Sequence, residues 1–158
     1  MMKVGIAGMG KMGQAVAQRM LGLGHEVWVY NRNPARADAV IAAGAHRAAQ
    51  PIELSVHCDV VVSLLTDAAA VEQVYSGPQG LLGQARAVLI ESSTVAPEFQ
   101  EKMGKVARQA GVRYLECPVS GSIGPAKEGK LIGFVGGDRK STRLNSSHTD
   151  ISRMPSSA

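Results

Sequence analysis

Short apolar runs alternate with amphipathic segments along the first 137 residues of the chain. Residues 59–65 are apolar almost throughout, which is typical of a parallel strand covered on both faces. Residues 12–23 instead repeat their apolar positions with a helical period. We predict strands over residues 3–7, 26–30, 45–48, 59–65, 87–90, 112–116 and 131–135, and helices over residues 12–23, 35–42, 52–56, 68–75 and 97–110. This alternation predicts an α/β fold with a doubly wound parallel sheet and helices on both faces.

Three glycines, Gly8, Gly10 and Gly13, follow the first predicted strand and open the first predicted helix. In a G-x-G-x-x-G turn of a dinucleotide site, the first glycine permits the turn and the second lets the backbone approach the pyrophosphate. The third allows the helix to pack close to the strand. The phosphates then lie on the free N–H groups of the helix start. Such spacing also occurs in ordinary turns, but the flanking strand and helix favour a dinucleotide site.

The second part of the dinucleotide fingerprint lies at the end of the predicted strand 26–30. An NAD site usually has an acidic residue here, which binds the ribose hydroxyls, but this chain has Asn31 followed by Arg32. A guanidinium can bind the 2′-phosphate of NADP through paired, charge-assisted hydrogen bonds, and Arg36 could assist one turn later. We therefore predict NADP, with NAD as the alternative cofactor. A solvated surface arginine is the competing interpretation of Arg32.

The length and composition predict one cytoplasmic domain, without a metal site and without a membrane-spanning segment. The 158 residues are enough for one domain with a core, and no apolar run approaches the roughly 18 residues of a membrane span. A strand is predicted from residue 3, so we expect no secretory signal. Cys58 and Cys117 lie far apart without the spacing of a disulfide framework or zinc site. We therefore expect a cytoplasmic protein without a metal site.

The net charge of +4 belongs mostly to the end of the chain. Four basic residues and one acidic residue, Asp150, lie in residues 139–158, so the preceding 138 residues carry a net charge of only +1. They show no basic stripe with interleaved aromatic residues, which argues against a nucleic-acid partner.

Residues 138–158 differ in character from the rest of the chain. They are rich in Ser, Thr and Arg without strand or helix periodicity, and such a segment buries too little apolar area to offset its ordering entropy. Residues 138–148 and 152–158 also resemble a translated sequencing adapter. We therefore expect one domain over residues 1–137, a disordered non-native tail over 138–158, and a natural protein that is cut off near Gly137. A natural disordered tail is the alternative.

Together these motifs resemble the β-hydroxyacid dehydrogenase family. It includes 3-hydroxyisobutyrate dehydrogenase, 2-hydroxy-3-oxopropionate reductase and the glyoxylate and succinic semialdehyde reductases, and it is related to 6-phosphogluconate dehydrogenase. The resemblance covers residues 3–138. It depends on the glycine loop with Met12, Asn31-Arg32, Leu64-Leu65-Thr66, Ser92-Ser93-Thr94, Pro118-Val119-Ser120-Gly121 and Gly136-Gly137. It implies a Rossmann-type domain, truncated before an all-helical domain, in a homo-oligomer that transfers hydride between NADP(H) and a small hydroxy acid or its semialdehyde.

The resemblance also assigns roles to residues. It implies that the cofactor is bound by Gly8, Met9, Gly10, Lys11, Met12, Gly13, Asn31, Arg32, Leu64, Leu65, Thr66 and Thr94. It implies that the substrate carboxylate is bound by Ser120, Gly121 and Ser122, where hydroxyls and backbone N–H groups can hold an anion. Thr66 stands where the family usually has proline, and Ser122 where it usually has glycine. Plain turn chemistry is the alternative for these segments.

The family's general acid is a lysine in a G-x-x-x-K-x-x-N motif, and this sequence contains no such motif. We therefore assign no catalytic residue and expect the chain by itself to be inactive. Three alternatives stay open: a non-catalytic dinucleotide-binding module, an imine reductase that shares this domain, and a nucleic-acid-binding protein that uses its basic tail.

Overall fold

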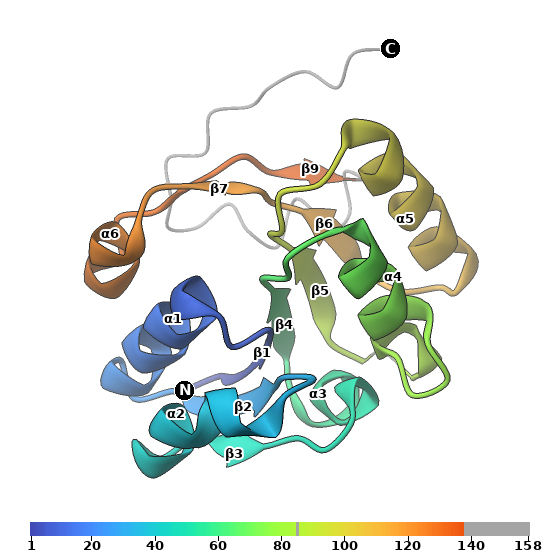
Figure 1. Ribbon diagram of the computed structural model, residues 1–158. Coiled ribbons are helices and arrows are strands. Elements are labelled where there is room, and N and C mark those ends of the chain that lie inside the picture. The colour runs from blue at the N-terminus through green and yellow to red at the C-terminus, as the bar shows by residue number, and fades with distance from the viewer. Residues whose placement is uncertain (85, 138–158) are drawn as a thin grey trace.

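A sheet of seven strands forms the centre of the computed structural model, which describes residues 1–84 and 86–137 (Figure 1). The strand order is β3-β2-β1-β4-β5-β6-β9, in which the strands up to β6 run parallel and β9 runs antiparallel to β6. The order of the parallel strands is that of a Rossmann fold, which confirms the predicted fold class. The strands are β1 (Lys3–Ala7), β2 (Glu26–Tyr30), β3 (His46–Arg47), β4 (Val60–Ser63), β5 (Val88–Glu91), β6 (Tyr114–Glu116) and β9 (Gly136–Gly137).

Helices cover both faces of the sheet and enclose two clusters of buried side chains. Because successive strand residues point to opposite faces, Ile6 of β1 packs in the cluster with Ala17 of α1, while Ala7 packs in the other with Leu54 of α3. The first face carries α1 (Lys11–Gly22), the 3-10 turn η1 (Pro34–Ala37) and α2 (Asp38–Ala42). The second carries α3 (Pro51–His57), α4 (Ala68–Ser76), the 3-10 turn η2 (Leu81–Gly83) and α5 (Pro97–Gln109).

The direction of the strand order reverses at β1. From β1 the chain builds outward to β2 and β3, then returns to place β4 on the other side of β1. The loops that leave the carboxyl ends of β1 and β4 therefore diverge, and such a switch point is where open α/β sheets bind ligands. This relationship places the glycine loop and the Leu64 turn side by side.

The last part of the domain departs from the sequence prediction. The prediction of one strand over residues 131–135 is wrong: β8 (Ile132–Gly133) forms a separate two-stranded antiparallel sheet with β7 (Val119–Ser120), and Gly136–Gly137 adds to the main sheet as β9. Between β7 and β8 lies α6 (Ile123–Glu128), which packs against α1 and was not predicted. Gly124 is a poor helix former, and the packing of α6 on α1, with Ala126 buried, accounts for this short helix.

Other boundaries shift by a few residues. The strand predicted over residues 45–48 is reduced to His46–Arg47, and the helix predicted over 35–42 begins as a 3-10 turn at Pro34. The predictions for residues 138–158, including the disordered adapter-like tail, lie outside the described residues. No helix within the described ranges has the length and apolar character that a membrane span requires.

Candidate functional site: the carboxyl edge of the sheet

The glycine loop between β1 and α1 has the geometry that its spacing predicts. Gly8 has a φ of +104°, and a Cβ there would clash with the carbonyl oxygen of Leu64. A Cβ on Gly13 would clash with the carbonyl oxygen of Gly8, because α1 packs so closely on the loop. At Gly10 a Cβ would meet no atom within 4 Å. Gly8 and Gly13 are thus needed by the backbone itself, whereas Gly10 leaves open space in front of the loop.

The start of α1 is free to bind an anion. Gly10 is its N-cap, and within the described part of the chain no side chain caps it and its first turn has no acidic residue. The first N–H groups of a helix have no partner inside it, and the helix dipole is positive there. Lys11 is exposed at the same position and Met12 is half-buried, while the side chain of Met9 lies fully in the core.

Asn31 connects the end of β2 to the glycine loop. Its Oδ1 accepts a hydrogen bond from the Met9 N–H at 2.9 Å, and its Nδ2 donates to the carbonyl of Asn33 at 2.7 Å. Next to it, the Gly8 N–H donates to the carbonyl of Tyr30 at 2.8 Å. Asn31, which the sequence predicts at the ribose position, thus also fixes the glycine loop with its side chain.

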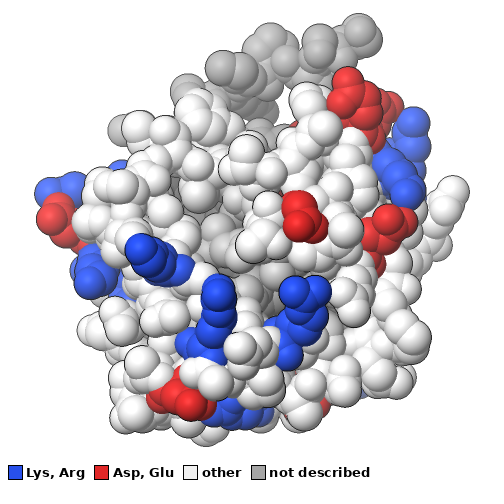
Figure 2. Space-filling model, viewed as in Figure 1, with Lys and Arg blue, Asp and Glu red and all other residues white. Residues whose placement is uncertain are grey.

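A pocket of about 350 Å³ lies at the ends of β2 and β3, beside Asn31 and Arg32. Its other lining residues include Pro34, Arg47 and Gln50, and none of the residues that line it is acidic. Figure 2 shows Lys and Arg side chains grouped on this side of the molecule, over α1 and the segment that follows β2. The pocket is therefore suited to an anionic group.

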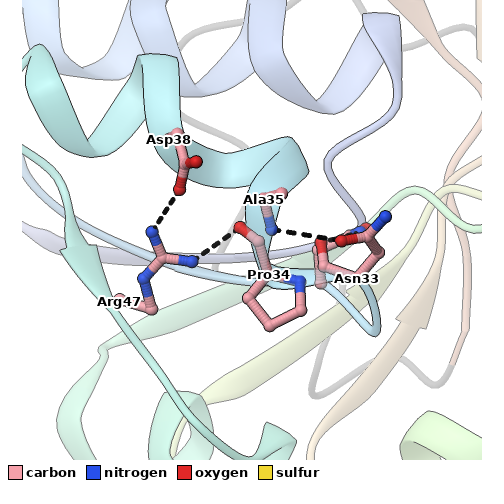
Figure 3. Close-up of polar contacts among 6 residues, drawn as sticks. Asn33, Pro34, Ala35, Asp38 and Arg47 are labelled. Atoms are coloured by element: carbon pink, nitrogen blue, oxygen red, sulfur yellow. Dashed lines mark hydrogen bonds and ion pairs between the residues drawn. The ribbon is translucent and has the colours of Figure 1, made fainter.

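Arg47 is a pocket residue that the sequence argument missed. Its guanidinium donates to the carbonyl of Pro34 and to the carboxylate of Asp38, both at 2.6 Å (Figure 3). Asn33 stabilises the same turn, because its Oδ1 accepts the Ala35 N–H at 3.2 Å. Arg32 and Arg47 are 15 positions apart, and no pattern in the sequence indicates that they lie together. Only the pairing of β2 with β3 brings them to one pocket.

The turns after β4 and β5 lie at the same edge and are bonded to each other. The Leu64 N–H donates to the carbonyl of Ala7 at 2.9 Å, and the Leu65 N–H donates to Ser93 Oγ at 2.8 Å. Thr66 and Thr94 are both exposed there. The structure thus brings these predicted cofactor residues to the edge where β1 ends.

Glu91 is a second residue that the sequence argument missed. It ends β5 with a fully buried side chain, and it accepts hydrogen bonds from Ser63 Oγ at 2.6 Å and from the Ser93 N–H at 2.5 Å. The Tyr75 hydroxyl bonds Ser63 Oγ at 2.6 Å. Burial raises the pKa of Glu91, against the opposing effect of its hydrogen bonds. The sequence signal was a single carboxylate at the end of an otherwise apolar strand.

The predicted substrate segment lies further along the chain, where β7 leads into α6. Ser120, Gly121 and Ser122 are exposed, and Ser122 is the N-cap of α6. Gly121 has a φ of +136°, and a Cβ there would lie 2.7 Å from the Leu131 side chain. Within the described ranges, no cluster of three or more His, Cys, Asp or Glu side chains could hold a metal ion.

Residues 3–147 match the model of a family described as the NAD binding domain of 6-phosphogluconate dehydrogenase. The chain belongs to this family. Among curated relatives of this NAD binding domain, the cytokine-like nuclear factor N-PAC of Danio rerio is 36% identical over 139 residues, which cover 87% of the chain and 30% of the relative. The 3-hydroxyisobutyrate dehydrogenase of Pseudomonas aeruginosa is 34% identical over 139 residues, which cover 87% of the chain and 47% of the relative.

A solved structure of Psf3 in complex with NADP+ and 2-OPP has the same fold as this NAD binding domain. It superimposes with a TM-score of 0.84 at 35% identity, and the match covers 89% of the chain and 51% of Psf3. The chain therefore spans between about a third and a half of the length of these proteins. It is an NAD(P)-binding domain of the hydroxyacid dehydrogenase family.

Proposed function

We propose that the chain is the NADP(H)-binding domain of an oxidoreductase that acts on a small hydroxy acid or its semialdehyde. The main support is the pocket at the ends of β2 and β3, where Arg32 and Arg47 line the wall and no acidic residue does. A carboxylate at the end of β2 would repel a 2′-phosphate, and a guanidinium attracts it. The name of one relative, 3-hydroxyisobutyrate dehydrogenase, supports the substrate class.

Each part of the edge then has a role in binding. The glycine loop and the start of α1 hold the pyrophosphate, and Arg32 binds the 2′-phosphate. Leu64, Leu65, Thr66 and Thr94 contact the nicotinamide half of the cofactor. When bound, the nicotinamide supplies or accepts the hydride. Ser120, Gly121 and Ser122 bind the substrate carboxylate through hydroxyl and N–H groups.

The proposed reaction also needs a general acid. The family resemblance gives this role to a lysine in a motif that the sequence does not contain. We therefore expect the chain to bind cofactor without turnover. The cytoplasmic location and the homo-oligomer of the full protein remain predictions.

Calorimetric titration of the chain with NADPH and with NADH tests the cofactor assignment. We expect the chain to bind NADPH more tightly than NADH. Arg32→Ala should weaken NADPH binding about tenfold, which corresponds to about 1.4 kcal/mol, and should change NADH binding little. Arg108→Ala is the matched control, because it removes an exposed arginine of α5 that does not line the pocket. Equal losses for both cofactors in Arg32→Ala would refute the phosphate role, and heat from neither would refute the binding function.

A second candidate is a non-catalytic dinucleotide-binding module. It is supported by the 36% identity to N-PAC, whose name describes a nuclear factor rather than an enzyme. The two candidates bind the same cofactor but differ in the chain that follows the domain. Sequencing of the source gene beyond the codon for Gly137 distinguishes them: a helical continuation with the lysine motif favours the enzyme, and an early stop favours the module.

A further inference from the structure

Glu91 is a buried carboxylate to which the cofactor-binding function proposed above assigns no role. Its side chain is held by hydroxyl and N–H donors, and within the described ranges it has no cation as a partner. Burying a carboxylate without a cation costs free energy, and a well-packed apolar side chain is often at least as stabilising. Stability alone therefore does not explain a carboxylate here.

The bonds around Glu91 join two loops of the cofactor edge. Oε2 accepts from Ser63, the last residue of β4, and Oε1 accepts from the N–H of Ser93 after β5. The Ser93 hydroxyl in turn accepts the N–H of Leu65, in the turn after β4. Glu91 thus holds Ser93 in place through the Ser93 N–H, and the Ser93 hydroxyl holds the backbone of Leu65 in place.

The same turn also reaches the glycine loop. The carbonyl of Leu64 contacts Gly8 so closely that a Cβ on Gly8 would not fit. Because the Ser93 hydroxyl accepts the Leu65 N–H, a shift of Ser93 would move the Leu65 turn and disturb the surface beside it, where Thr94 and Thr66 are exposed. The glycine loop keeps its own bonds to the end of β2, from the Gly8 N–H to the Tyr30 carbonyl and from the Met9 N–H to Asn31. The pocket with Arg32 and Arg47 lies on the other side of β1, at the ends of β2 and β3.

We propose that Glu91 is a positioning residue that holds the turns after β4 and β5 for the nicotinamide half of the cofactor. This inference rests on the proposed cofactor function. It means that the loss of Glu91 impairs one half of the site and leaves the adenosine half intact. A purely structural role would impair both halves together.

The experiment compares two ligands on the full 158-residue chain by calorimetric titration. NADPH reaches both halves of the site, and 2′,5′-ADP reaches only the half with the glycine loop and Arg32. The variants are Glu91→Ala, which removes the network, Glu91→Gln, which retains its shape and one acceptor oxygen, and Ser63→Ala, which removes the donor to Oε2. Ser55→Ala is the matched control, because Ser55 is also fully buried. Its hydroxyl donates to the carbonyl of Leu81 in η2 at 2.8 Å and makes no bond to Glu91 or Ser93.

We expect Glu91→Ala and Ser63→Ala to bind NADPH about tenfold more weakly, which corresponds to about 1.4 kcal/mol, with unchanged binding of 2′,5′-ADP. Glu91→Gln should recover part of the loss, and Ser55→Ala should bind both ligands like the unaltered chain. If Glu91→Ala does not fold, the binding of the two ligands to Ser63→Ala tests the positioning role by itself. Undiminished NADPH binding, or parallel losses for both ligands, would overturn the positioning role and leave the proposed function standing. Failure of the unaltered chain to bind either ligand would overturn both.

Discussion

The side chain of Asn31 accepts a hydrogen bond from the backbone N–H of Met9 at 2.9 Å. This bond spans the boundary between the two parts of the dinucleotide fingerprint, because Met9 lies in the glycine loop and Asn31 follows β2. One side chain therefore contributes both to the shape of the glycine loop and to the absence of negative charge at the position where we propose that the 2′-phosphate binds. The two contributions can be separated by substitution.

We predict that Asn31→Asp shifts the cofactor preference toward NADH. A carboxylate can still accept the Met9 N–H, but its charge repels a 2′-phosphate beside Arg32. NADPH affinity should fall about tenfold or more, and NADH affinity should stay the same or rise. Asn31→Ala instead loses the bond and should weaken both cofactors alike. Titrations of both variants with both cofactors check this, and parallel losses in Asn31→Asp would contradict it.

Asp38→Asn should strengthen NADPH binding. The carboxylate of Asp38 engages Arg47 at 2.6 Å, so its removal frees a guanidinium that lines the pocket. The pair is partly exposed, so the gain should be no more than about fivefold, about 1 kcal/mol, and it should shrink at high salt. Binding isotherms at two salt concentrations measure it. Arg47→Ala should have the opposite sign, and weaker NADPH binding in Asp38→Asn would show that the ion pair is needed to hold the turn.

Substitutions of three glycines should separate folding from binding. Gly13→Ala should destabilise the domain by several kcal/mol, because its Cβ meets the Gly8 carbonyl oxygen and the packed backbone must move. Gly10→Ala meets no atom within 4 Å, so it should fold normally but place a methyl group where the phosphates approach. Thermal unfolding and NADPH titration are the two measurements.

Gly22→Ala is the control for both glycine variants. It lies near the end of α1 with open space around it, and alanine there should stabilise the helix by up to about 1 kcal/mol. Its NADPH binding should not change. If Gly10→Ala also retains full NADPH affinity, the pyrophosphate does not lie over the glycine loop.

Glu91 should contribute a loss of stability as pH rises above the ordinary carboxyl value of 4.5. Burial raises the pKa of Glu91, so in this window the folded chain keeps a proton that the unfolded chain has lost. The folded state then binds more protons, and the free energy of unfolding decreases with pH.

Glu91→Gln carries no such proton and should lose this part of the pH dependence. Denaturant unfolding of both proteins across the window measures the difference in slope. Ser55→Ala should retain the slope of the unaltered chain. An equal slope in Glu91→Gln would show that Glu91 is ionised to the same extent in the folded and unfolded states.

The glycine loop and the parallel strands were predictable because their signals are local. Gly8, Gly10 and Gly13 occur within six residues, and the apolar run that contains β4 is continuous in the sequence. Their geometry follows from the backbone alone: two of the three glycines have no room for a Cβ. The predicted edge with Leu64 and Thr94 followed from the rule that parallel strands end together.

The missed features depend on contacts between distant segments. Arg47 reaches the pocket because β3 pairs with β2, and the predicted strand over residues 45–48 did not indicate which strand it pairs with. Glu91 meets Ser63 across 28 positions through the pairing of β4 with β5. α6 forms against α1 despite Gly124 in its first turn. No single-segment pattern contains these relationships, so tertiary packing decides them.

One outer strand of the main sheet, β3, has only two residues. Long, flat outer strands offer unpaired backbone groups to other molecules and promote aggregation, and very short ones limit that risk. On the β6 side, β9 comes so close that a Cβ on Gly136 would clash with the Glu116 carboxylate. Because the clash is with a side chain that can rotate, alanine at Gly136 should displace the Glu116 carboxylate and leave β9 in place along the edge of β6.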